Sequence, residues 1–182
     1  MYRHAPAFVG APGILVPAAL VVEETFNFER HTGVTLEPRV ILADYNQAED
    51  LLTVHMANQA PHMMQAVLSK HLGIAEENVR FVARDVGGSF GIKIHTYGDE
   101  VAVAAIAKLL GRPVKCTLSR EESFRMHAKR HPITFEYRAG CDADGRLTAL
   151  HVRGIGDSGA YASVGMKVLE RAAGHACGPY RW

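Results

Sequence analysis

Cysteine is scarce in this sequence, and its spacing excludes several kinds of site. The three cysteines, Cys116, Cys141 and Cys177, are widely separated and odd in number. They form no C-x-x-C pair of the kind that holds zinc or an iron–sulfur cluster. They also do not make up the even number of cysteines that forms the disulfides of a small secreted domain. We therefore expect three reduced thiols and a cytoplasmic location.

An excess of one sign of charge is also missing. Twenty Lys and Arg residues stand against nineteen Asp and Glu residues, which leaves a formal net charge of +1. A protein that grips nucleic acid presents a basic patch or stripe to the phosphates. The basic stretches at 108–115 and 125–130 are short, so we expect them to be solvated surface and we expect no nucleic-acid partner.

The ten histidines lack the spacing of a metal site. No H-E-x-x-H motif occurs, and the one i,i+4 pair, His127 and His131, flanks a basic stretch that ends at Pro132. Such a pair without further ligands is a poor zinc site. We therefore expect no metal ion to be held directly by side chains of this chain.

Long apolar runs are missing as well, although 48% of the residues are hydrophobic. Residues 1–22 are rich in apolar side chains, but Pro6, Pro12 and Pro17 interrupt them. A membrane-spanning helix needs ~20 unbroken apolar residues, and a secretory leader needs a continuous helical apolar stretch. We expect an irregular lead-in over residues 1–22, with no targeting role, and no membrane partner.

The elements that are present alternate between strand and helix. Apolar runs at 40–43 and 51–55 flank a polar turn and predict a β-hairpin. Pro61 can begin a helix that Gly73 ends, and a small-residue stripe predicts a second helix over 97–110, ended by Gly111.

The second half of the chain has the same mixed character. The remaining predicted elements are strands at 79–83, 114–118 and 133–138, a short helix after the N-cap Ser119 with Glu122 three residues on, and a hairpin turn at 142–145 that leads into a strand at 147–152. This interleaving predicts an α+β fold with a mixed, mainly antiparallel sheet and packed helices, rather than a doubly wound nucleotide fold.

The most informative local feature is the loop at residues 85–93, which we call the glycine loop. Gly87 and Gly88 stand side by side, and Gly91 follows Phe90. Glycine permits positive φ and close approach of a ligand, and a run of outward N–H groups can hold an anion. The spacing is neither G-x-x-x-x-G-K-[ST] nor G-x-G-x-x-G. From the pattern alone, an anion-binding loop and a tight structural turn both stay open.

Several motifs in a fixed order resemble one known family. They are V-G-G-S-F-G-x-K at 86–93, N-Q-x-P-H at 58–62, L-E-P-R at 36–39, L-G-R-P-V-K at 110–115, D-x-G-A-Y at 157–161 and E-R at 170–171. Together they resemble the large, molybdopterin-binding subunit of the xanthine dehydrogenase, aldehyde oxidase and carbon monoxide dehydrogenase family. The resemblance implies a partial molybdopterin-binding domain over residues 23–182.

The resemblance implies roles for particular residues. In the family, the glutamine that matches Gln59 lies beside the molybdenum's apical oxo ligand. An amide suits this place, because its NH2 can donate to such a group and its oxygen can accept from substrate or water. The family's Phe-Gly that matches Phe90-Gly91 passes along the molybdenum centre and its pterin, although a phenylalanine taken alone is more often a core residue. The cofactor-binding residues that we expect are Gln59, Gly87, Gly88, Ser89, Phe90 and Gly91.

Two further matches concern the substrate and the loop's support. Glu170 and Arg171 match a pair whose arginine reaches the substrate pocket in purine-oxidising members, and a plain surface pair is the alternative. Lys93 is expected to pair with a carboxylate or a helix end. Ile94 stands where purine-oxidising members commonly carry glutamate. The substrate therefore stays open between an aldehyde, a purine-like N-heterocycle and a related small molecule.

The same resemblance implies a larger assembly. Family large subunits are several times longer than this chain, and we expect the distal half of the pterin site, with the family's general-base glutamate, to lie beyond Trp182. No catalytic residue is therefore assigned to this chain, which alone is expected to be inactive. Iron–sulfur and FAD components on partner chains or domains are expected to take the electrons. The alternative is a truncated, non-catalytic cofactor-binding or assembly module.

Overall fold

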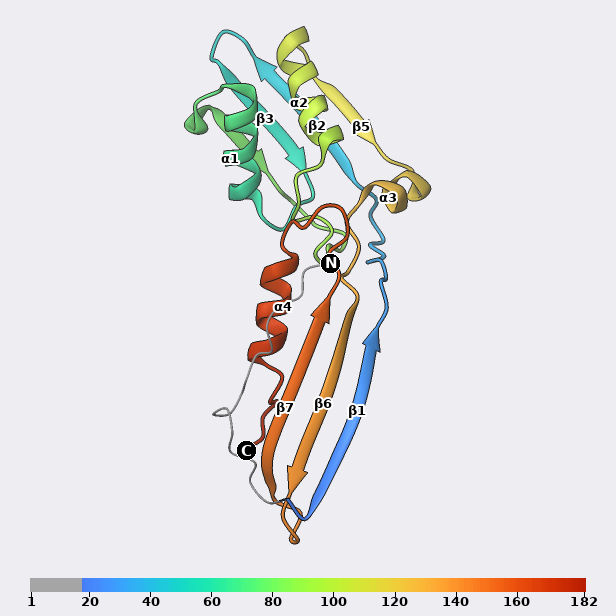
Figure 1. The fold of residues 1–182 in the computed structure, drawn as a ribbon. Helices are drawn as coiled ribbons and strands as arrows, with labels where there is room; N and C mark the ends of the chain where they lie inside the picture. Colours follow the sequence, from blue (N-terminus) through green and yellow to red (C-terminus); the bar gives the residue numbers. More distant parts are fainter. Residues whose placement is uncertain (1–17) are drawn as a thin grey trace. The chain divides into compact units, whose positions relative to one another are not determined.

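A computed structural model describes residues 18–182, which divide into two compact units. One unit is continuous and comprises Thr32–Lys129. The other combines the described residues up to His31 with Arg130–Trp182. In Figure 1, which is coloured from blue at the N-terminus to red at the C-terminus, the second unit contains both the blue strand β1 and the orange to red elements β6, β7 and α4. Of the lead-in expected at 1–22, residues 1–17 lie outside the described residues.

The continuous unit is built on a four-stranded sheet in the order β4-β3-β2-β5. The predicted hairpin is confirmed, since β2 and β3 pair antiparallel, with Ala43 opposite Val54. The strand β5 extends the sheet antiparallel to β2, whereas β4 runs parallel to β3. The strands span Val40–Asn46 (β2), Leu51–Met56 (β3), Val79–Val82 (β4) and Val114–Thr117 (β5).

A parallel pair needs a crossover connection, because a tight turn only joins antiparallel strands. The helix α1 (Pro61–Leu72) and the short 3-10 helix η1 (Glu76–Asn78) provide that crossover between β3 and β4. As predicted, α1 has Pro61 in its first turn and ends at Gly73, whose φ of 61° is left-handed. The sheet is thus mixed and mainly antiparallel.

The core of this unit lies between the sheet and two helices. Along β2 and β3 alternate side chains are buried, as expected when successive residues of a strand point to opposite faces. The helix α2 (Gly98–Leu110) packs small residues against the sheet, and Gly111 ends it. The core residues are Ile41, Ala43, Tyr45, Leu52, Val54, Met56, Met64, Leu68, Ile74, Val79, Val103, Ala104 and Ala107.

The short helix α3 (Arg120–Met126) begins with the capping box that the sequence predicts. The Ser119 hydroxyl accepts from the Glu122 N–H at 3.2 Å, and the Glu122 carboxylate accepts from the Ser119 N–H at 2.7 Å. Reciprocal bonds of this kind satisfy two of the N–H groups that a helix start otherwise leaves unpaired. The capping box at Ser119, two residues after β5 ends at Thr117, thus starts α3.

The other unit is a three-stranded antiparallel sheet in the order β1-β6-β7 with one helix, α4 (Gly165–Gly174). Figure 1 shows α4 beside β7. Leu169 of α4 packs over Gly154 and Gly156 of β7, where the missing side chains let the helix approach. The strands span Leu20–Phe28 (β1), Ile133–Cys141 (β6) and Leu147–Gly156 (β7).

Two differences from the sequence predictions lie in this unit. The strand β1 begins at Leu20, so the irregular lead-in that we expected over residues 1–22 is wrong for its last three residues. Backbone pairing with β6 from Leu20 to Phe28 orders them. The helix α4 was not among the predicted elements. Between residues 18 and 182, no helix is both long and apolar enough to cross a membrane.

Candidate functional site

The glycine loop leads from β4 towards α2 and contains three left-handed residues. Its turn is closed by the Ile92 N–H, which donates to the Ser89 carbonyl at 2.9 Å. Gly88 and Gly91 have φ values of 93° and 85°, which glycine adopts without steric cost. Phe90 has a φ of 50°, which is uncommon for a bulky residue. Local preference thus explains the two glycines but not the left-handed backbone of Phe90.

Phe90 is exposed over 71% of its surface. The alternative that Phe90 is an ordinary core residue is therefore wrong for this chain. An exposed aromatic ring on a left-handed backbone is the kind of strained feature that occurs at functional sites.

Gln59 joins the second motif to this loop. It lies between β3 and α1, and its backbone N–H donates to the Lys93 carbonyl at 3.1 Å. Its side-chain Oε1 accepts from the Gly91 N–H at 3.1 Å and from the Ser89 hydroxyl. A backbone N–H can only donate, so the amide atom that faces Gly91 is the oxygen. We expected the Gln59 oxygen to accept from substrate or water, but it accepts from the loop instead. Within the described residues, the loop forms no hydrogen bond with the Nε2 donors.

Asn58 helps to place Gln59. Its side chain is buried, and its Oδ1 accepts from the Ala60 N–H at 2.6 Å in an Asx turn that leads into Pro61. Its Nδ2 has no partner among the described residues. The turn fixes the backbone on both sides of Gln59.

The two ends of the glycine loop meet at Glu37. The Lys93 Nζ lies 2.6 Å from the Glu37 Oε2, and the same oxygen accepts from the Gly87 N–H at 3.0 Å. The prediction that Lys93 pairs with a carboxylate is confirmed. Glu37 belongs to the L-E-P-R motif, but nothing in the spacing of that motif connects it with a loop 50 residues away.

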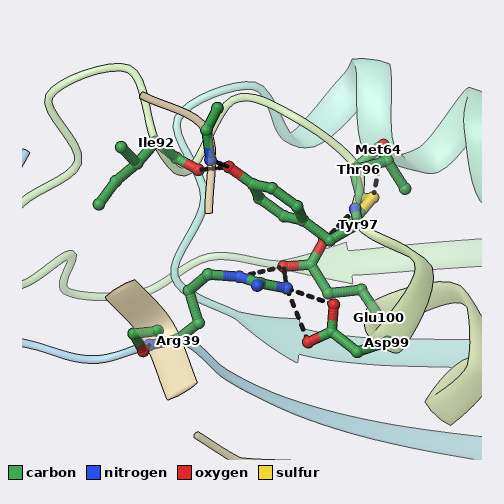
Figure 2. A network of polar contacts seen from close by, with 9 residues as sticks. Arg39, Met64, Ile92, Thr96, Tyr97, Asp99 and Glu100 are labelled. Atoms are coloured by element: carbon green, nitrogen blue, oxygen red, sulfur yellow. Dashed lines mark hydrogen bonds and ion pairs between the residues drawn. The ribbon is translucent and has the colours of Figure 1, made fainter. Parts of the chain in front are cut away.

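A partly buried tyrosine, Tyr97, supports the far end of the loop (Figure 2). The Tyr97 hydroxyl donates to the Ile92 carbonyl at 2.7 Å and accepts from the Ala128 N–H at 3.0 Å. Burial raises the pKa of this hydroxyl, so it stays protonated and keeps its donor.

Arg39 holds the tyrosine ring in place. Its guanidinium lies 3.9 Å from the centre of the Tyr97 ring and donates to Glu100 at 2.8 and 3.0 Å and to Asp99 at 2.7 Å (Figure 2). Burial opposes the charge of Arg39, but both carboxylates outweigh burial and raise its pKa. Glu100 also accepts from the Tyr97 N–H at 3.0 Å, which caps α2. This network was not found from the sequence, because Arg39 lies about 60 residues from its partners Asp99 and Glu100.

His127 is a buried neutral histidine in the same unit. Its Nε2 lies 2.5 Å from the Thr32 hydroxyl, and its Nδ1 has no partner among the described residues. Burial, with the nearby charges of Lys129, Arg39 and Arg120, lowers its pKa to about 4. Among residues 18–182 no cluster of three or more His, Cys, Asp or Glu side chains could hold a metal ion.

Glu170 and Arg171 lie on α4, in the unit of the three-stranded sheet. Both are exposed, and Glu170 forms an ion pair with Lys167 at 3.0 Å, one turn away on the same helix. The structure brings Gln59, Ser89 and Gly91 together in the other unit. A substrate role for Glu170 and Arg171 stays a prediction.

Comparison with known proteins identifies the family. The model of the molybdopterin cofactor-binding domain family matches residues 12–182. The large molybdopterin subunit of nicotinate dehydrogenase from Eubacterium barkeri is 38% identical over 165 residues, which are 88% of this chain and 37% of that protein. A probable xanthine dehydrogenase subunit from Bacillus subtilis is 36% identical over 88% of this chain and 21% of its own length.

Solved structures agree on the fold. Quinoline 2-oxidoreductase from Pseudomonas putida superposes with a TM-score of 0.72 and 31% identity, over 77% of this chain and 18% of that chain. Aldehyde oxidoreductase from Desulfovibrio gigas superposes with a TM-score of 0.77 and 25% identity, over 85% of this chain and 17% of that chain. This chain spans 37% or less of the length of each of these four proteins. Its match to the family over residues 12–182, joined to the α+β fold, shows that the chain belongs to the molybdopterin cofactor-binding domain family of molybdenum hydroxylases.

Proposed function

We propose that this chain forms part of the molybdopterin site of a molybdenum hydroxylase large subunit, with Gln59 and the glycine loop along the cofactor. The observation that carries the proposal is the 3.1 Å hydrogen bond from the Gly91 N–H to the Gln59 Oε1. It joins two motifs 32 residues apart into one site. A turn with a purely structural role would not need a hydrogen bond from its Gly91 N–H to a side-chain amide 32 residues away.

The residues at this site suit a flat, anionic cofactor. A Cβ at Gly91 would meet no atom within 4 Å, so that side of the loop is open. Phe90 offers an exposed ring on which a planar group can pack, and Gln59 offers an uncharged Nε2 donor. The Gly87 N–H already donates to Glu37, so the further backbone donors for an anion are the N–H groups of Gly88 and Ser89.

The chemistry of such an enzyme comes from the cofactor, and this chain orients it. When bound, the molybdenum–pterin group supplies the redox step by which oxygen derived from water is transferred to a substrate carbon. The role of Gln59 is to place one neutral donor without changing the charge of the site. The role of Phe90 and Gly91 is to shape the wall and leave room for the group.

The substrate and the partners belong to the same proposal. The relatives are named for nicotinate, xanthine, quinoline and aldehyde chemistry, which supports an aldehyde or a purine-like N-heterocycle as substrate, with Glu170 and Arg171 near it. Two relatives are named as single subunits of larger enzymes, which supports partner chains. We assign to them, or to further domains, the iron–sulfur and FAD groups that carry electrons away. The free cysteines at 116, 141 and 177 support a reducing, cytoplasmic compartment.

A second candidate function is a non-catalytic cofactor-binding or assembly module. It is supported by the chemistry of the site groups, because the Gln59 amide and the Phe90 ring can contact a cofactor but cannot act as acid or base. Turnover of aldehydes and purines in a dye-reduction assay separates the two functions. We expect turnover from the assembled large subunit and none from the 182-residue chain alone.

The test of the site is cofactor retention by the assembled large subunit, purified from cells that make molybdopterin. Gly91→Val should lower the molybdenum and pterin content, because a branched side chain resists a φ of 85° and fills the open side of the loop. Gly145→Val is the matched control, since Gly145 also has positive φ, 80°, and no atom within 4 Å of its Cβ position. Equal cofactor content in the two variants would contradict the proposed site.

A further inference from the structure

One carboxylate ties together the two ends of the glycine loop. Glu37 Oε2 lies 3.0 Å from the Gly87 nitrogen near the start of the loop and 2.6 Å from the Lys93 Nζ at its end. A loop whose ends are pinned to one group has fewer conformations open to it than a loop held only by its flanking elements.

Glu37 is itself held against the loop through its backbone. Its N–H donates to the Gly87 carbonyl at 3.1 Å, and its own carbonyl accepts from the buried Thr35 hydroxyl at 2.6 Å. A Cβ on Gly87 would lie 2.4 Å from the Glu37 Cβ, so the two chain segments are in direct contact. The carboxylate therefore has little room to leave its partners.

The buried ammonium of Lys93 depends on the Glu37 carboxylate for its counter-charge. The Lys93 side chain is 2% exposed, whereas that of Glu37 is 32% exposed. A buried ammonium that loses its counter-charge is strongly destabilising, while the partly exposed carboxylate can be solvated. The ion pair thus sets the position of Lys93 more than it sets that of Glu37.

Lys93 is hydrogen-bonded directly to Gln59, so a shift of Lys93 would move Gln59. The Lys93 carbonyl accepts from the Gln59 N–H at 3.1 Å, and the Gln59 side chain accepts from the Gly91 N–H at 3.1 Å. A continuous series of contacts therefore leads from the Glu37 carboxylate through Lys93 to the Gln59 amide and back to the loop.

We propose that Glu37 is a positioning residue for the cofactor site, whose carboxylate closes the loop from Gly87 to Lys93 and so fixes the Gln59 amide and the loop's N–H donors. The inference rests on the proposed function, since the cofactor is what the positioned groups would contact. Glu37 acts through Gly87, Lys93 and Gln59 and needs no contact of its own with the reacting atoms.

The first test measures amide hydrogen exchange by NMR on the full 182-residue chain. Glu37→Gln should make exchange at Gly91 about tenfold faster, which is the size of one lost hydrogen bond, and should lower the thermal midpoint. The control is Glu121→Gln, because Glu121 also forms a 2.6 Å ion pair, with Arg125, in the same unit but on the exposed surface. Equal Gly91 exchange rates in Glu37→Gln and Glu121→Gln would overturn the proposal.

A second variant keeps the test decisive if Glu37→Gln alone does not fold. The double variant Glu37→Gln, Lys93→Met buries no unpaired charge, so it should recover most of the thermal midpoint while Gly91 exchange stays fast. Recovery of both quantities would show that Glu37 only neutralises a buried charge, and would overturn the positioning role.

The cofactor content of the assembled large subunit completes the test. The double variant should retain several-fold less pterin than the parent, and Glu121→Gln should retain the parental amount. Parental pterin content in the double variant, despite fast Gly91 exchange, would overturn the inference for the cofactor site. Failure of the proposed function is distinguishable, because then the parent protein itself would lack pterin.

Discussion

At the scale of single residues, the site depends on which atom of each polar group is already used. The Gln59 oxygen is used by the Gly91 N–H and the Ser89 hydroxyl, so in the proposed site Gln59 would contact the cofactor through its Nε2. The Glu37 carboxylate is used twice, by Gly87 and by Lys93. Substitutions that keep one atom and remove the other can therefore separate holding the loop from contacting the cofactor.

The first prediction uses that difference at Gln59. Gln59→Ala should leave the fold nearly intact and lower the activity of the assembled enzyme by roughly 10- to 100-fold, the usual cost of losing a supporting partner of a metal site. Gln59→Glu keeps an oxygen that can accept from Gly91 and removes the Nε2 donors, so it should lose activity while keeping slow Gly91 exchange. The measurements are kcat/KM and amide exchange. Full activity of Gln59→Glu would show that the Nε2 donors are not needed.

A control for this prediction is available on the next helix. Gln65 of α1 donates from its Nε2 to the Val79 carbonyl at 2.8 Å and to the Glu76 carbonyl at 3.0 Å. Gln65→Ala removes an amide with structural partners, so it should lower stability and leave kcat/KM per folded enzyme unchanged. If Gln59→Ala and Gln65→Ala behaved alike, Gln59 would be a structural residue.

The second prediction concerns His127 and pH. Its pKa in the folded protein, about 4, lies below the ordinary value of 6.5 because burial and nearby cations disfavour its charged form. Between these two values the unfolded chain binds the proton more readily than the folded chain, so stability falls as the pH drops from above 6.5 to about 4. The full loss from this group is about 3 kcal/mol.

The measurement is the free energy of unfolding in urea as a function of pH. His127→Gln keeps a polar side chain next to Thr32 but does not titrate, so its stability should fall less steeply between pH 6.5 and 4. His71→Gln, at an exposed histidine of the same unit, is the control. Identical slopes for the parent chain and His127→Gln would contradict the prediction.

At the scale of elements, the helices and strands with local signals could be predicted from the sequence. Pro61 and Gly73 bound α1, Gly111 ends α2, and the Ser119 box begins α3, and each signal acts through backbone groups within a few residues. The parallel direction of β4 could not be predicted, because direction depends on a crossover and not on the strand's own residues.

The two elements that were missed lack such signals. All nine residues of β1 are exposed, so neither face carries the buried alternation that identifies a strand, and two glutamates lie at its centre. The helix α4 starts without a side-chain cap and ends without a left-handed glycine. Both are ordered by non-local contacts, β1 by pairing with β6 and α4 by packing on β7.

The candidate site divides in the same way. The resemblance predicts that Gln59 and the glycine loop lie close together. It does not predict that the Gln59 oxygen accepts from the Gly91 N–H. Glu37 lies 50 residues from Gly87, and Arg39 lies 61 residues from Glu100, so only the fold brings these groups together. Pairings at such distances leave no periodicity in the sequence.

At the scale of the whole molecule, most of the buried apolar residues belong to the continuous unit. The core of the continuous unit is closed by α1 and α2. In the other unit, β1 lies at an edge of the described sheet, and Leu20, Val22, Phe26 and Phe28 are each exposed by 48% or more. A long, apolar edge strand is a template for pairing with another chain.

The last prediction is that the 182-residue chain self-associates through β1. Light scattering should show an apparent mass that rises with concentration, and Val22→Lys should lower the associated fraction several-fold, because a charge on an edge strand opposes strand addition. Val34→Lys is the matched control, since Val34 is exposed to nearly the same degree, 58% against 56%, but lies in the other unit. A parent chain that stays monomeric, or equal association of the two variants, would contradict the prediction, because exposed apolar area alone would affect both valines alike.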